Sequence, residues 1–308
     1  MTMNDIGTIL GITLMYASPL MFGSLSGVMS ETTGVVNIGI EGMMTIGAFA
    51  GAAVAYFSGS AWLGFLCAGL AGLFIALFHA IATIRFRADH VVSGIAINFI
   101  GPGFALFLTK LLFDGAANTL PLDNTAKMPR WFSDVFPAGS FIDQIVDQYA
   151  PVYIAFLMAI LIWIILYKTR LGLRLRSVGE HPKAADTLGV PVYLMKYVGV
   201  LSSGFLAGLG GAALSMAIIS SFRPTLVSGQ GFIALAAMIF GRWTPHGAIL
   251  GCLLFGLAQG LVVFLGGGRL PISEQLLSTL PYVITLVVLL FSKSSAGPNA
   301  NGLNYVKE

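Results

Sequence analysis

Residues 151–167, PVYIAFLMAILIWIILY, form an uninterrupted apolar run without a charged side chain. A helix needs roughly 20 mostly apolar residues to cross the hydrocarbon core of a bilayer, so this run approaches spanning length. The whole chain of 308 residues shares this character, with 56% hydrophobic and 9% charged residues. Soluble domains carry about 25% charged residues, so the composition excludes a soluble enzyme and a nucleic-acid-binding domain. We predict an all-α, polytopic bundle of membrane helices.

Similar apolar runs recur along the chain and predict nine membrane segments, within a range of eight to ten. We expect them at residues 6–29, 34–57, 62–84, 91–113, 151–167, 195–219, 230–241, 247–265 and 276–291. The seventh segment is too short to cross a bilayer alone, which points to a broken helix. We treat residues 1–308 as a single transmembrane domain.

The lysines and arginines are divided unevenly between the two alternating sets of loops and segment ends. Of the 16, the larger set holds Arg85, Arg87, Lys168, Arg170, Arg174, Arg176, Lys183, Lys196, Arg242, Lys293 and Lys307. Because cytoplasmic loops are enriched in these residues, this set is predicted to face the cytoplasm. The N-terminus is then outside and the C-terminus inside. The loop 114–150 is predicted to be an extracytoplasmic cap loop, with a short amphipathic helix lying on the membrane surface.

The chemistry-bearing residues do not form a catalytic or metal-binding pattern. The two cysteines and four histidines lack metal-ligand spacing, and no G-x-x-x-x-G-K-[ST] sequence for binding ATP phosphates occurs. An enzyme within the membrane would need a nucleophile and base, or a metal constellation. We therefore expect no catalytic residue, no metal site and no ATP hydrolysis in this chain.

Two polar residues interrupt the second predicted segment. Asn37 and Glu41 are four residues apart and would share one face of a helix. A charge in mid-bilayer costs on the order of 2.5–3.5 kcal/mol and normally faces protein or water. One interpretation is an element that lines or gates a pathway. The other is a buried carboxyl group satisfied by neighbouring backbone groups, which holds a kinked helix.

The fourth predicted segment contains Ser93 and Asn98 in an otherwise apolar run, followed by Gly101-Pro102-Gly103. The Gly-Pro-Gly sequence is expected to kink or break the helix within the membrane. Broken helices expose backbone groups to substrates in transporters, so Ser93 and Asn98 are candidate pathway residues. The alternative is that they form hydrogen bonds between helices. Phe99 could stack on a planar ligand, or contact the core or lipid.

A second Gly-rich polar turn opens the seventh segment. Ser228-Gly229-Gln230-Gly231 resembles the residues from Asn37 to Gly42 that precede the apolar part of the second segment. The similarity suggests an internal duplication, which is a common plan in transporters.

The loop 168–194 is the longest and most charged of the predicted cytoplasmic loops. Pro182 suits the first turn of a short helix, and Gly189 suits its C-terminal end. The helix and its flanks are expected to comprise Glu180, His181, Lys183, Ala184, Ala185, Asp186 and Gly189. A short helix ended in this way on the cytosolic face is a candidate docking element, although the loop could also serve only to set membrane orientation.

Several of these stretches resemble one family of membrane proteins. The loop GLRLRSVGEHPKAADTLGV resembles the coupling loop of permease subunits in ATP-binding-cassette importers, specifically the branched-chain amino acid/ribose type. The stretches TGVVNIGIEGMM, RADHVVSGIAIN and GFIALAAMIFGRW resemble the nucleoside-importing branch of that family. The resemblance covers residues 16–291.

The resemblance implies a permease subunit of an importer in the bacterial cytoplasmic (inner) membrane, surrounded by lipid and not bound to nucleic acid. It implies that residues Glu180–Gly189 dock on a separate ATPase subunit, which would bind ATP and Mg, so that this chain needs no cofactor. It also implies a second permease chain, homologous but not identical, and an extracytoplasmic substrate-binding protein or lipoprotein. Asn37, Glu41, Ser93 and Asn98 would lie near the translocation path.

Two alternatives to nucleoside import stay open at the level of sequence. The simple-sugar branch, which includes ribose importers, is similar in architecture. An ion-coupled secondary transporter could use Glu41 as its proton or sodium site.

Overall fold

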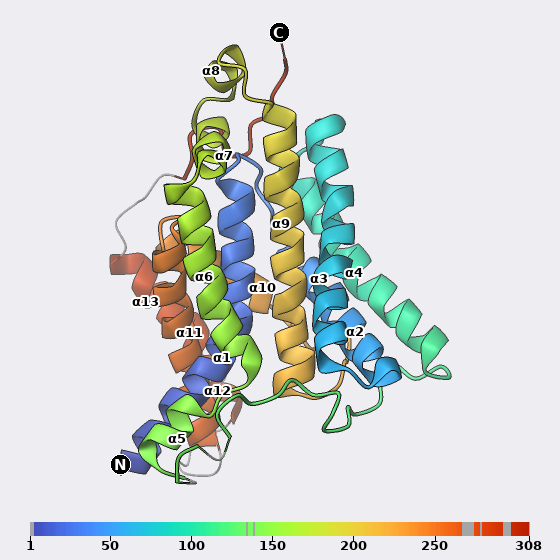
Figure 1. The fold of residues 1–308 in the computed structure, drawn as a ribbon, viewed down its shortest axis with the longest axis vertical. Coiled ribbons are helices and arrows are strands. Elements are labelled where there is room, and N and C mark those ends of the chain that lie inside the picture. The colour runs from blue at the N-terminus through green and yellow to red at the C-terminus, as the bar shows by residue number, and fades with distance from the viewer. Residues whose placement is uncertain are drawn as a thin grey trace.

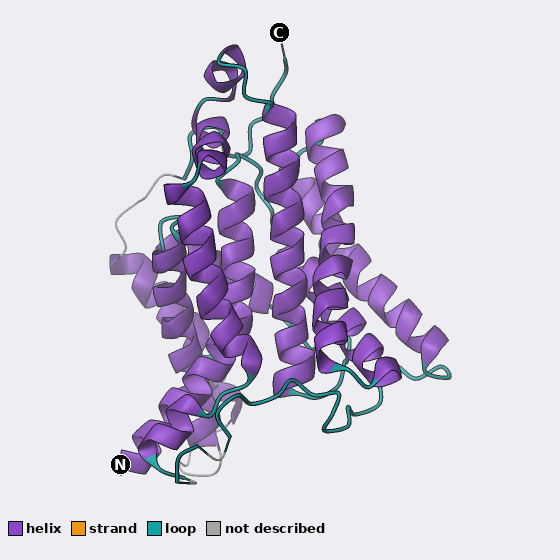
Figure 2. Ribbon diagram, in the orientation of Figure 1, coloured by secondary structure: helices purple, strands orange, loops and turns teal. Residues whose placement is uncertain are grey.

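The computed structural model describes residues 3–133, 135–137, 139–266, 274–277, 279–291 and 297–307. Within these ranges the chain is helical, and its β-structure is limited to an isolated bridge between Arg130 and Tyr149 (Figure 2). The helices are α1 (Met3–Glu31), α2 (Ile40–Ser58), α3 (Ala61–Ala80), α4 (His90–Leu112), α5 (Phe141–Val146), α6 (Ala150–Lys168), α7 (Arg170–Glu180), α8 (Pro182–Thr187), α9 (Val192–Ala212), α10 (Gln230–Phe240), α11 (Pro245–Gly266), α12 (Glu274–Leu277) and α13 (Leu280–Phe291). Short π-helical turns, Ile81–Arg85 and Ala213–Ile218, extend α3 and α9.

Seven of these helices are long and apolar enough to cross a membrane: α1, α2, α3, α4, α6, α9 and α11, with α3 and α9 counted together with their π-helical turns. They coincide with seven of the nine predicted segments. The seventh predicted segment is α10, which at 11 residues confirms that it cannot cross alone. The ninth predicted segment falls on α12 and α13 and includes residue 278, which lies outside the described residues.

The two ends of the bundle differ in what they carry (Figure 1). The N-terminus, α5 and the loop before it lie at one end, which we call the cap end. The C-terminal residues and α8 lie at the opposite end, which we call the α8 end. Termini at opposite ends require an odd number of crossings, as the nine predicted segments would give.

Helices α2 and α10 both begin inside the bundle, beside the middle of α1. A Cβ atom added to Gly23 of α1 would lie 2.8 Å from Ala234 of α10 and 3.3 Å from Met44 of α2. Helix α10 then runs to the α8 end, where Trp243 meets Glu31 at the end of α1. Helix α2 runs to the cap end. The two Gly-rich turns that resemble each other in sequence therefore open two adjacent helices of opposite direction, an arrangement that fits an internal duplication.

Two expectations about broken helices need correction. The second segment does not begin as a helix at residue 34, because residues 35–37 are non-helical and α2 starts at Ile40. Of the kink or break expected at Gly101-Pro102-Gly103, the break is wrong, since α4 continues through it to Leu112. Gly101 instead permits contact with α2, where its Cβ would lie 2.5 Å from the carbonyl oxygen of Gly42. The glycine thus serves packing between helices.

Glycine-mediated backbone contact holds the centre of the bundle together. A Cβ on Gly47 of α2 would lie 2.4 Å from the Cα of Gly208 in α9. A Cβ on Gly72 of α3 would lie 2.2 Å from the carbonyl oxygen of Gly204, also in α9. Gly47, Gly204 and Gly208 therefore act as small residues that allow close packing between helices. Without a hydrophobic driving force between helices in lipid, such close contact supplies the packing energy.

The packing predicts a large difference between two glycine substitutions. Gly208→Ala should lower the stability of the bundle by about 1–3 kcal/mol, because its Cβ would lie 2.1 Å from the carbonyl oxygen of Ala68. Gly103→Ala is the control, since a Cβ there meets nothing within 4 Å. Thermal unfolding of the purified variants in detergent measures both. Equal midpoints for the two variants would contradict the packing argument.

Candidate functional site

The carboxylate of Glu41 joins the starts of α2 and α10. The N–H of Gly229 donates to Oε1 at 2.6 Å, and the N–H of Gly231 donates to Oε2 at 2.7 Å. Both donors belong to the first turn of α10 or its N-cap, where helix N–H groups lack partners within the helix. A negative charge is also favoured at a helix N-terminus by the helix dipole. These contacts are what the second interpretation of Glu41, a carboxyl group satisfied by backbone, requires.

Both residues that donate to Glu41 need to be glycine. Gly229 adopts φ +89°, a left-handed conformation that other residues rarely take. A Cβ on Gly231 would lie 2.7 Å from the backbone nitrogen and Cα of Glu41. The Gly-rich turn at residues 228–231 is therefore the shape that brings two backbone N–H groups onto one carboxylate.

Asn37 and Asn98 satisfy the non-helical backbone before α2. Asn98 of α4 accepts from the N–H of Gly42 at 2.9 Å and donates to the carbonyl of Ile38 at 3.0 Å. Asn37 is fully buried, accepts from the N–H of Gly39 at 3.1 Å and donates to Ser203 of α9 at 2.9 Å. In lipid, an open backbone segment persists only where such partners are supplied.

Ser93 acts on the same segment through His79. The Nε2 atom of His79 lies 3.1 Å from the carbonyl of Val36, which can only accept, so Nε2 carries the proton. Nδ1 then accepts from the Ser93 hydroxyl at 2.9 Å. The N–H of Val36 donates to Nδ1 of His90 at 3.2 Å. Ser93 therefore contacts this backbone segment indirectly, through the His79 ring.

The structure therefore brings together four of the five predicted pathway residues and separates the fifth. Asn37 and Glu41 belong to residues 36–42, which comprise the end of the non-helical segment and the first turn of α2, and Ser93 and Asn98 lie beside these residues. Phe99 lies apart, with 78% of its surface exposed on the outer side of α4. His90 and Ser203 could not be predicted from the sequence as partners of this segment, because a polar residue near a helix end or in a distant helix carries no local signal of its partner.

The predicted docking helix is present at the α8 end. Helix α8 begins at Pro182 and ends at Thr187, and Gly189 has φ +78°. Ala185 is buried, whereas Leu188 is 84% exposed, so the helix presents an apolar side chain beyond the bundle. The preceding α7, which was not predicted, is a second amphipathic helix at this end, with Leu173 exposed and Leu175 buried.

The C-terminal residues hold the α7–α8 turn in place. Glu180 accepts from Nδ2 of Asn299 at 2.7 Å, and the N–H of Ala300 donates to the carbonyl of Gly179 at 2.8 Å. Lys307 forms an ion pair with Asp186 at 3.7 Å. Glu180 and Asp186, both predicted as docking residues, thus have partners within this chain.

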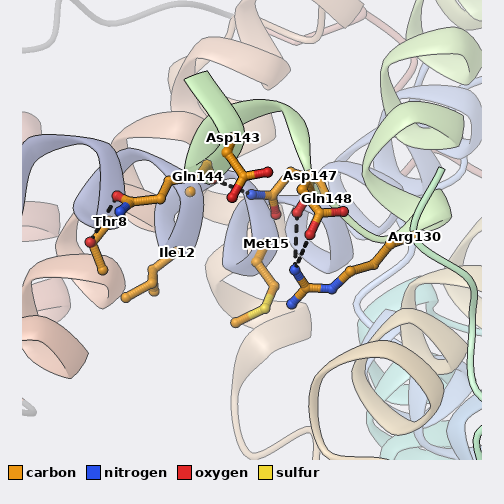
Figure 3. A pocket seen from close by; sticks show the side chains of 9 residues that line it. Thr8, Ile12, Met15, Arg130, Asp143, Gln144, Asp147 and Gln148 are labelled. Carbon is orange, nitrogen blue, oxygen red and sulfur yellow. Dashed lines mark hydrogen bonds and ion pairs between the residues drawn. The ribbon is translucent and has the colours of Figure 1, made fainter. Parts of the chain in front are cut away.

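The cap loop forms a pocket of about 290 Å³ against α1 (Figure 3). Arg130 pairs with Asp147 at 2.6 Å, and the Thr8 hydroxyl donates to Oε1 of Gln144 at 2.9 Å. The predicted short helix of the loop is α5, which packs on α1 so closely that a Cβ on Gly11 would lie 2.2 Å from the carbonyl oxygen of Gln144. The position of α5 is therefore fixed by its packing against α1.

Comparison with known proteins identifies similar chains over almost the full length. The family model described as the permease component of branched-chain amino acid transport systems matches residues 9–292. The chain is 42% identical to the nucleoside ABC transporter permease protein NupC of Lactococcus lactis, over 99% of this chain and 98% of that protein. It is 42% identical to the guanosine ABC transporter permease protein NupQ of Bacillus subtilis, over 98% of this chain and 99% of that protein. It is 32% identical to TsgC13 of Haloferax volcanii, over 92% of this chain and 91% of that protein. TsgC13 is provisionally named a glucose ABC transporter permease.

The Glu41 geometry predicts that a neutral substitution destabilises the bundle. Glu41→Gln keeps one oxygen but directs an NH₂ group at the other N–H of α10, which leaves a buried donor unpaired. The loss should be about 1–3 kcal/mol. Thermal unfolding in detergent measures it, and Asp123→Asn, at an exposed position of the cap loop, should change stability by less than about 0.5 kcal/mol. A Glu41→Gln variant as stable as the control would show that the contact is dispensable.

Proposed function

The chain belongs to the family of permease components of branched-chain amino acid transport systems, and we propose that it is the permease subunit of an ATP-driven importer of nucleosides. The permease component of such a system forms the membrane channel and is not itself an enzyme. The observation that supports the substrate most directly is the 42% identity, over nearly the full chain, to permeases named for a nucleoside and for guanosine. The relative named for glucose is less similar, at 32% identity.

A separate ATPase subunit supplies the energy in this proposal. The sequence contains no Walker A motif, so ATP and Mg would be bound by that partner. Helix α8 is the element that fits ATPase docking, because it projects from the end of the bundle with Leu188 exposed. Lys183 and Ala184 of α8 are also exposed.

The α8 end is cytoplasmic in this proposal and the cap end faces outside. Most of the lysines and arginines belong to the α8 end, as the positive-inside rule requires of the cytoplasmic side. The protein is then a multi-pass component of a bacterial cytoplasmic membrane with its N-terminus outside. An extracytoplasmic substrate-binding protein or lipoprotein would approach the cap end, where the Arg130 pocket opens.

A second permease chain, homologous and not identical, completes the proposed channel. Large apolar side chains are exposed on α4 and α13, including Phe99 at 78% and Leu290 at 82%. Lipid and a second permease together would cover such surfaces. In this arrangement Phe99 faces outward from its own bundle, and a pathway role for it requires the second chain on that side.

Reconstitution tests the proposed function. The permease pair, its ATPase and the substrate-binding protein, assembled in proteoliposomes, should accumulate radiolabelled guanosine or uridine only when ATP is supplied. Excess unlabelled nucleoside should abolish the signal, whereas excess glucose or ribose should not. Uptake without ATP, or competition by glucose alone, would contradict the proposal.

The docking role of α8 predicts a selective loss of coupling. In Ala185→Pro, the N–H that donates to the carbonyl of His181 at 3.0 Å is removed, and the ring disrupts the six-residue helix α8. The ATPase subunit should no longer copurify with this variant, or its ATP hydrolysis should lose its dependence on substrate.

Ala126→Pro is a matched control at the cap end. It also removes an alanine N–H from a turn, in this case the bond to Asp123 at 2.9 Å. This variant should retain the ATPase subunit. Normal coupling in Ala185→Pro, or equal loss of the ATPase in both variants, would show that α8 is not the docking element.

A further inference from the structure

A cavity of about 250 Å³ lies between α1, α10, α11 and α13, beside the first turn of α10. Its polar and aromatic lining consists of Tyr16, Ser228, Gln230, Gln259 and Tyr282. Its volume approaches the roughly 300 Å³ at which small-molecule sites begin. The cavity adjoins the Glu41 contact, since Gln230 lies between the two glycines whose N–H groups Glu41 binds.

Two carboxamide groups in this cavity have unused hydrogen-bonding capacity. The Oε1 atoms of Gln230 and Gln259 are buried and have no hydrogen-bond partner among the described residues. Buried side-chain oxygens are almost always paired, so each such atom needs an explanation. A ligand that offers N–H donors would satisfy both glutamines after rotation of their amide groups, and the same amides could donate to acceptors on that ligand.

The pseudo-equivalent turn before α2 is packed against α4. There, α2 and α4 are in backbone contact, and a Cβ on Gly42 would lie 2.3 Å from the carbonyl oxygen of Ile97. The amide oxygen and the amide nitrogen of Asn98 in α4 are both bonded to the backbone of residues 38–42. The two Gly-rich turns thus open similar helices, but the α2 turn packs against α4, whereas the α10 turn lies beside a cavity with unpaired amides.

The lining restricts the class of ligand. The residues that surround the cavity in the described part of the chain include no lysine, arginine, aspartate or glutamate, so a phosphate or carboxylate would lack a counter-charge. Two tyrosine rings provide flat apolar surfaces. Planar bases stack on aromatic side chains and are identified through hydrogen bonds along their edges, and glutamine can pair with two edge atoms of adenine at once.

We propose that this cavity binds the base of the transported nucleoside, with Tyr16 and Tyr282 flanking the ring and Gln230 and Gln259 bonded to its edge. The inference rests on the proposed function, because it assigns a recognition site to the nucleoside path. Tyr282 is 58% exposed, so the site is open to the surface of the bundle. The sugar would extend past Ser228.

Transport kinetics of the full complex in proteoliposomes test this assignment. Gln230→Ala and Gln259→Ala should each raise the KM for nucleoside at least fivefold. Each should also change the ratio of guanosine to uridine uptake by a similar factor, because the two bases present different edges. The kcat should change less than twofold. Leu257→Ala, two residues before Gln259 on α11 and outside the cavity, should leave KM and the ratio unchanged.

The possible outcomes separate the cavity from the proposed function. A wild-type complex that transports nucleosides, with variants that leave KM and base preference unchanged, would overturn the cavity assignment alone. A wild-type complex that transports no nucleoside would overturn both. A change in KM without a change in base preference would also overturn the assignment, since it would indicate a structural effect.

Photolabelling of the wild-type complex supplies a second test that does not depend on how the variants fold. The complex is illuminated with 8-azidoguanosine during ATP-driven uptake, and the labelled peptides are identified by mass spectrometry. Adducts at Tyr16 or Tyr282 that disappear with excess guanosine support the site. Guanosine-protected adducts confined to other segments would overturn it.

Discussion

The contact between the Glu41 carboxylate and the first turn of α10 is the interaction on which the rest of the bundle depends. Both α2 and α10 begin inside the protein, and each start leaves N–H groups that lipid cannot satisfy. One carboxylate accepts from Gly229 and Gly231 of α10 while its own backbone opens α2. The charge that would be costly in lipid is thereby placed where a helix N-terminus stabilises it, and two helices of opposite direction are fixed to each other.

The sequence predicts well those features that follow from local composition. Apolar runs located the spanning helices, and Pro182 with Gly189 located α8, because these residues act on their own segments. The sequence predicts poorly what depends on distant neighbours. Gly101-Pro102-Gly103 has the pattern of a break, yet Gly101 packs against Gly42 and α4 continues. The partners of Glu41 lie 188 and 190 residues away. The sequence showed residues 228–231 as a second Gly-rich turn, but it did not show that this turn binds Glu41.

The C-terminal residues relate the α8 end to the same break. Lys307 pairs with Asp186, and the N–H of Gly302 donates to the carbonyl of Gly34, just before the non-helical residues 35–37. Asn301 and Trp243 both donate to Glu31, so the end of α1 and the turn after α10 are joined there as well. One short segment therefore contacts the proposed docking helix, the start of the break and the end of α1, so the proposed docking surface is in hydrogen-bonded contact with the interior.

The same constraint explains why a neutral ligand suits this protein. Among the described residues, Glu41 is the charged side chain closest to the start of α10, and both of its oxygens are occupied by backbone N–H groups. A cationic substrate that paired with Glu41 would compete with the N–H groups of α10 for this carboxylate. An anionic substrate would meet a carboxylate already in place. Discrimination near this junction therefore falls to uncharged groups, and the amides of Gln230 and Gln259, with their unpaired oxygens, are the groups that the structure leaves for it.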